Sequence, residues 1–123
     1  MRLEVRSVVL GAPDAGELAA FYERLLGWTR VDDEPGWVKL RGTGGGTALA
    51  FQTEDGYVRP VWPGEPGAQQ QMAHLDIGAD DLGAAIGWAV RNGATEAAFQ
   101  PQDDVRVMLD PAGHPFCLFA MSS

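Results

Sequence analysis

The sequence is poor in residues that cross-link a fold. Its 123 residues include one cysteine and two histidines. A single cysteine cannot form an internal disulfide, so the fold does not depend on an oxidising compartment. The composition, 46% hydrophobic and 21% charged, is typical of a globular chain. A chain of this length buries about two-thirds of its unfolded surface, so it needs no cross-links to fold.

Basic residues are also scarce. Nine Lys and Arg residues against 17 Asp and Glu residues give a net charge of −8. Nucleic acids and anionic membranes bind proteins through basic patches, so we expect neither as a partner. The acidic balance is compatible with a cationic ligand, although acidity more often serves solubility.

Long apolar runs are missing as well. No stretch approaches the 18 consecutive apolar residues of a membrane-spanning helix. The first residues, MRLEVRSVVLGAPDAG, are interrupted by charges and lack the apolar core of a signal peptide. We therefore expect a soluble, cytoplasmic protein.

One pattern of elements occurs twice along the chain. Residues 3–11 predict a strand, and an apolar face beginning at Leu18 predicts a helix that ends at Gly27. Three short β-rich stretches follow: WTRV, GWVKLR and TALAFQ. Residues 72–78 then predict a second strand of the first kind, followed by a helix that ends at Gly93. The stretches TEAAF, VRVML and PFCLF complete the second copy.

The two copies predict an α+β fold. It consists of two tandem βαβββ modules that form curved mixed sheets around a cleft. Module one covers about residues 1–53 and module two about residues 71–123. A proline-rich linker, about residues 54–70, joins them within a single domain.

Three stretches carry a resemblance to a known family: VVLGAPDAGELAAFYERLLGW, HLDIGADDLGAAIGWAVRNGA and VMLDPAGHPFCLF. They resemble the vicinal oxygen chelate superfamily, which includes glyoxalase I, bleomycin-resistance proteins and extradiol dioxygenases. The likeness is greatest to small glyoxalase-like domain proteins. Such a fold hosts several chemistries, so the resemblance implies the fold more directly than the function.

The resemblance also implies where a metal would be held. In metal-using members, ligands lie early in the first strand and in the last strand of each module. The matching positions here are Ser7, His74, Leu49 and Cys117. His74 and Cys117 are able to bind a divalent metal, whereas Ser7 is a poor ligand and Leu49 is none. We therefore predict no metal cofactor, and His74 with Cys117 as the ligands if one binds.

Each of these residues also has a structural interpretation. His74 begins a strand and is able to bond to a neighbouring backbone group. Cys117 lies in the apolar stretch FCLF, where a small core thiol is inert. His114 lies in DPAGH, which predicts the turn of the last hairpin.

Aromatic residues supply a second kind of site. We predict that Trp37, Phe51, Tyr57 and Trp62, together with His74, line a ligand pocket. Aromatic rings bind flat or cationic molecules by stacking and cation–π contacts. The alternative is that these rings fill the core.

Three functions remain open at this point. The first is metal-independent binding of a small aromatic or cationic molecule, as in the acidic, homodimeric drug-sequestering members of the family. The second is a metal-dependent lyase, isomerase or dioxygenase of glyoxalase type that uses His74. The third is a subunit that binds only other proteins. The sequence leaves open whether the protein is an enzyme, and the resemblance implies a homodimer.

Overall fold

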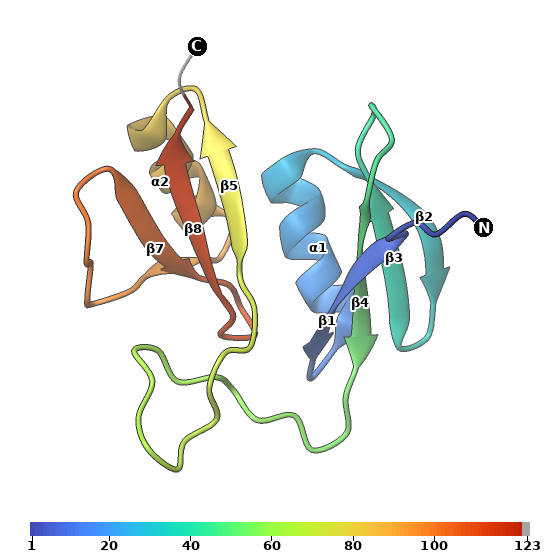
Figure 1. Ribbon diagram of the computed structural model, residues 1–123, viewed down its shortest axis with the longest axis horizontal. Helices are drawn as coiled ribbons and strands as arrows, with labels where there is room; N and C mark the ends of the chain where they lie inside the picture. The colour runs from blue at the N-terminus through green and yellow to red at the C-terminus, as the bar shows by residue number, and fades with distance from the viewer. Residues whose placement is uncertain (122–123) are drawn as a thin grey trace. The chain divides into compact units, whose positions relative to one another are not determined.

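The computed structural model describes residues 1–121 and contains two compact units, residues 1–57 and the chain from Val58 onward (Figure 1). Each unit consists of one four-stranded mixed sheet and one helix. Neither sheet closes on itself. The predicted α+β fold of two tandem βαβββ modules is therefore confirmed.

The first unit begins with strand β1 (Ser7–Ala12) and helix α1 (Ala15–Leu26). Strands β2 (Thr29–Glu34), β3 (Trp37–Arg41) and β4 (Ala48–Thr53) follow. The order in the sheet is β1-β4-β3-β2, with β1 parallel to β4 and the other pairs antiparallel.

The second unit repeats this arrangement. Strand β5 (Leu75–Ala79) precedes helix α2 (Leu82–Arg91), and strands β6 (Thr95–Glu96), β7 (Val105–Leu109) and β8 (Pro115–Ala120) follow. The order is β5-β8-β7-β6, with β5 parallel to β8. Between Thr53 and Leu75 no strand or helix forms, which agrees with the proline-rich linker (Figure 1).

The boundaries of several elements differ from the prediction. Strand β1 begins at Ser7 rather than at residue 3, because its partner β4 begins at Ala48, opposite Ser7. Strand β5 begins at Leu75, opposite Phe116; one position earlier it would face Pro115, which has no N–H group. Helix α2 ends before Asn92 rather than at Gly93. The side-chain amide of Asn92 caps this end by donating to the Trp88 carbonyl oxygen at 2.9 Å.

Local sequence signals explain the helix ends. The Asp14 carboxylate accepts hydrogen bonds from the N–H groups of Gly16 and Glu17, which the first turn of α1 would leave unpaired. Gly27 adopts φ = 69° at the other end, a left-handed conformation that glycine reaches without strain. Asp81 caps α2 by accepting from the Ala84 N–H group at 3.0 Å.

Helix α1 covers one face of its sheet and forms the core of the first unit. Its buried residues Leu18, Phe21 and Tyr22 pack toward β3 and β4, and the Tyr22 ring stacks on the Phe51 ring at 5.5 Å. In the second unit, Phe116, Leu118 and Met108 form the equivalent buried layer. Within residues 1–121, neither helix is long and apolar enough to cross a bilayer.

Candidate functional site

Strand β8 presents two different faces. Phe116 and Leu118 are buried on the face that packs against α2. Side chains alternate along a strand, so Cys117 and Phe119 lie on the opposite face, where both are partly exposed. Asp76 of the parallel neighbour β5 pairs directly with Cys117 and shares this open face.

Three polar side chains meet on this open face. His74, immediately before β5, brings its Nε2 atom to 3.2 Å from Asp76 Oδ1. The Cys117 Sγ atom completes a group in which all ligand atoms lie within 4.8 Å of one another. The side chains of His74 and Asp76 are 41% and 63% exposed, so the group is accessible from solvent.

The thiol of Cys117 is held in its protonated form. Burial raises its pKa above the ordinary value of 9.0, because the thiolate would be poorly solvated. The negative charge of Asp76 raises the pKa further, and so does a hydrogen bond between the thiol and that carboxylate. Near neutral pH, Cys117 is therefore a neutral hydrogen-bond donor to Asp76 and a weak nucleophile.

A hollow opens beside the three side chains. It has a volume of about 570 Å³ and is lined by His74, Asp76, Gln102, Asp104, Val105, Cys117, Phe119 and Ala120. A smaller hollow of about 140 Å³ adjoins it, sharing His74 and Cys117, and Trp62 forms part of its wall. The Trp62 ring lies 5.9 Å from the Phe99 ring, in a tilted arrangement.

The turn before β8 positions Cys117. Asp110 is 1% exposed, and its Oδ1 atom accepts hydrogen bonds from the N–H groups of Ala112 and His114, each at 2.9 Å. Gly113 has φ = 91° and lies against Arg59, so a side chain at that position would collide with the Arg59 stem. The segment DPAGH is therefore a hairpin turn, as predicted from the sequence, and it fixes where β8 begins.

The first unit has no such group at the corresponding positions. A shift of 67 residues relates the pair Val9–Ala50 to the pair Asp76–Cys117. The earlier assignment of Leu49 as the counterpart of Cys117 is wrong. Phe51 stacks on Tyr22 and so faces α1, which places Leu49 on the helix side and Ala50 on the open face.

Two members of the predicted aromatic pocket, Trp37 and Phe51, lie on opposite faces of the first sheet. Phe51 is fully buried against α1 and belongs to the core. Val38 pairs with Phe51, so its neighbour Trp37 lies on the opposite face, where the Trp37 Nε1 atom donates to Asp32 Oδ2 at 3.4 Å. Tyr57 is partly buried at the end of the first unit, near Gly11. Of the four aromatic residues, the structure brings Trp62 to the same hollow as His74.

Sequence reasoning missed Asp76, Gln102 and Asp104. Asp76 carried a usable signal, since residues two apart in a strand share a face and His74 was already a candidate. Gln102 and Asp104 lie in an irregular segment before β7, where no periodicity indicates which side chains face a hollow.

Comparisons with known proteins agree with this architecture. The family model described as a glyoxalase-like domain matches residues 7–119. No curated protein matches the sequence.

Among solved structures, the chain is similar to a glyoxalase/bleomycin resistance protein/dioxygenase family enzyme from Burkholderia phytofirmans PsJN. The identity is 17%, the TM-score is 0.71, and the match covers 98% of this chain and 100% of that one. A glyoxalase-related enzyme from Fulvimarina pelagi shows 18% identity and a TM-score of 0.69, over 98% and 89% of the two chains.

TnmS3, an antibiotic binding protein from Streptomyces sp. CB03234, shows 20% identity and a TM-score of 0.63, over 98% of both chains. At these identities the three structures support the fold alone.

Proposed function

This chain belongs to the glyoxalase-like domain family, and we propose that it binds a small aromatic or cationic molecule in the hollow of its second unit. The observation that carries the proposal is the composition of that hollow. Asp76 and Asp104 supply two carboxylates, and Trp62 supplies an aromatic wall beside His74. This combination attracts a cation and offers a ring for it to stack on.

The size of the hollow supports the same function. Pockets that hold small molecules have volumes of about 300–1,000 Å³ and combine apolar walls with a few polar groups. The larger hollow has about 570 Å³, and Val105 and Phe119 add apolar surface to it. TnmS3, an antibiotic binding protein with a similar fold, supports ligand binding as a use of this architecture.

The side chains of the first unit support metal independence. The positions related to Asp76 and Cys117 there are Val9 and Ala50, which have no ligand atoms in their side chains. The raised pKa of Cys117 also favours a neutral thiol, which is a poor ligand until a metal displaces its proton.

Isothermal titration with benzyltrimethylammonium, an aromatic cation, tests the binding function. We expect saturable binding to the wild-type protein and none of benzenesulfonate, an aromatic anion. Trp62→Leu should weaken binding about tenfold, because it removes one cation–π wall. Trp88→Leu is the matched control, since Trp88 lies on α2 and is 44% exposed. Equal binding of the cation and the anion would contradict the proposal.

A second function is supported by the three-donor group itself. An imidazole nitrogen, a carboxylate oxygen and a thiol sulfur within 4.8 Å of one another fit the donor preferences of zinc. Three protein ligands are the number that catalytic zinc sites use, and a bound metal would act as a Lewis acid on a substrate oxygen. His74, Asp76 and Cys117 would hold the ion in a metal-dependent glyoxalase-type enzyme.

Titration with cobalt(II) separates the two functions. Coordination by Cys117 would produce a thiolate-to-cobalt absorption band, and this band should disappear in Cys117→Ser and weaken in His74→Ala. If no band appears and the aromatic cation binds, the metal-dependent function is excluded. If a band appears with one ion per chain, the metal-independent proposal fails.

The homodimer and the cytoplasmic location remain predictions. Light scattering would test whether the protein is a dimer.

A further inference from the structure

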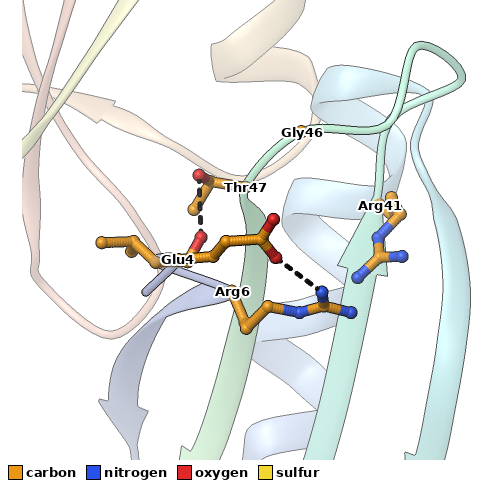
Figure 2. Close-up of a pocket in the computed structure, with 6 residues that line it drawn as sticks. Glu4, Arg6, Arg41, Gly46 and Thr47 are labelled. Atoms are coloured by element: carbon orange, nitrogen blue, oxygen red, sulfur yellow. Dashed lines mark hydrogen bonds and ion pairs between the residues drawn. The ribbon is translucent and has the colours of Figure 1, made fainter. Parts of the chain in front are cut away.

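The first unit contains a hollow of its own, far from the three-donor group in sequence (Figure 2). It has a volume of about 390 Å³ and is lined by Glu4, Val5, Arg6, Arg41, Gly46 and Thr47. Two guanidinium groups and one carboxylate line it, so its walls carry a net positive charge. That sign is unusual in a chain with a net charge of −8.

Arg41 lines this hollow from strand β3. It is the last residue of β3, on the face opposite Leu40, which is buried toward α1. Its Nε atom is buried and has no hydrogen-bond acceptor among residues 1–121. A buried donor without an acceptor is costly, and such groups are rare in folded proteins. A change of the Arg41 rotamer that exposes this N–H group to an external acceptor would remove that cost.

Arg6 and Glu4 form the opposite wall. Arg6 Nη1 donates to Glu4 Oε2 at 3.0 Å, and Arg2 also donates to this carboxylate. Figure 2 shows the Glu4 carboxylate beside the Arg6 guanidinium, with the Arg41 side chain reaching in from β3. The Glu4 carboxylate therefore neutralises part of the positive charge of the hollow.

Backbone contacts hold this wall in place. The Ala48 N–H group donates to the Arg6 carbonyl oxygen at 3.0 Å, next to the first pair of the β1–β4 ladder. The Thr47 hydroxyl donates to the Val5 carbonyl oxygen at 3.3 Å. The segment before β1 is thus anchored to the start of β4, and Arg6 starts from a fixed backbone position.

We propose that this hollow binds an oxyanion, the phosphate or carboxylate group of a small molecule, between Arg41 and Arg6. Guanidinium groups present planar pairs of donors that match the oxygens of these anions. The anion would accept from the Arg41 guanidinium group and compete with Glu4 for Arg6. The site lies in the other unit and has the opposite charge preference from the hollow beside His74, so it is independent of the function proposed above.

Nuclear magnetic resonance titration with inorganic phosphate, at constant ionic strength, tests the site. We expect saturable shifts of the Arg41 Nε–Hε signal and of the Gly46 and Thr47 backbone signals. A parallel titration with acetate distinguishes the two sources of the oxyanion: tighter binding of phosphate indicates a phosphorylated ligand, and tighter binding of acetate a carboxylate. Shifts that grow linearly with either anion and never saturate would overturn the proposal.

Two substitutions are expected to change the affinity for phosphate in opposite directions, and a third serves as their control. Arg41→Gln should weaken phosphate binding about tenfold, because it removes a charge-assisted donor pair. Arg91→Gln makes the same change of charge on α2 of the second unit and should leave binding unchanged. Glu4→Gln should strengthen binding severalfold, because it removes the competing carboxylate and leaves the fold of β1 intact.

These outcomes distinguish a site from general charge effects. If Arg91→Gln weakens binding as much as Arg41→Gln does, the anion responds to net charge alone and the proposal fails. If Glu4→Gln leaves phosphate affinity unchanged or lowers it, competition within the hollow is excluded and the proposal fails even where Arg41→Gln proves unstable.

Discussion

The two units share one topology, yet they differ in how closely the helix packs against its sheet. In the first unit the helix face is heavily packed: Leu18, Phe21 and Tyr22 are at most 2% exposed. In the second unit, Ala89 is the residue of α2 that is buried, and Trp88 is 44% exposed. The open faces differ as well. Ala50 stands in the first unit where Cys117 stands in the second.

This difference shows that two copies of one fold can carry different features, a tightly packed core in one and a polar group in the other. Polar groups on a half-exposed face avoid the cost of full burial, which explains why His74 and Asp76 lie at the edge strand β5. The strength of the core and the chemistry of the site are therefore expected to respond to substitutions in different units.

The largest expected effect concerns the two helix faces. Phe51→Ala removes a fully buried ring that stacks on Tyr22, and it should lower the free energy of unfolding by about 3–5 kcal/mol. Trp88→Ala removes a larger but exposed ring and should cost about 1 kcal/mol or less. Urea unfolding followed by circular dichroism measures both. Equal losses would show that the second unit depends on its helix as much as the first.

A smaller effect is expected from the two hairpins that precede β4 and β8. Asp110→Ala leaves the N–H groups of Ala112 and His114 without their acceptor and should cost about 2 kcal/mol. Asp110→Asn keeps an oxygen acceptor and should cost less. The first unit builds its hairpin from glycines, and a side chain at Gly44 would meet no atom within 4 Å. Gly44→Ala should therefore change stability by less than about 0.5 kcal/mol. A large loss in Gly44→Ala would contradict this comparison.

The sequence predicted the order of elements because its signals are local. Asp14, Gly27 and Asp81 mark helix ends through hydrogen bonds and φ values that depend on a few neighbouring residues. Local signals did not predict which side chains of β4 face the helix. Residues Ala48 to Phe51 are all buried, so the alternation that normally separates the two faces of a strand is absent. The sequence therefore gives no sign that the Phe51 side chain faces the helix.

The site was predicted only in part for a related reason. The resemblance pointed to His74 and Cys117, and the structure brings them together. Leu49 and Cys117 each lie four residues after a hairpin glycine, Gly45 and Gly113, which made them appear equivalent. The two glycines are not equivalent, because Gly45 lies three residues before β4 and Gly113 two residues before β8. Trp62 reaches the hollow from the linker, where no period exists to indicate the direction of a side chain.

The smallest expected effect tests whether the three-donor group acts as one electrostatic unit. Asp76→Asn removes the charge and weakens the hydrogen bond that raise the pKa of Cys117, so this pKa should fall, although burial keeps it above 9.0. Alkylation by iodoacetamide at pH 8 requires the thiolate, so its rate should rise in Asp76→Asn. Asp55→Asn, in an exposed turn of the first unit, is the matched control and should leave the rate unchanged.

The same pKa shift predicts how stability depends on pH. The unfolded chain releases the Cys117 proton near pH 9, whereas the folded chain holds it to higher pH. Stability from this thiol is therefore complete below pH 9 and declines as the pH rises toward the folded pKa. Cys117→Ala should flatten the decline seen in urea unfolding between pH 8 and pH 10. If the decline with pH persists in Cys117→Ala, other groups cause it. If Asp76→Asn leaves the alkylation rate unchanged, Asp76 and Cys117 titrate independently.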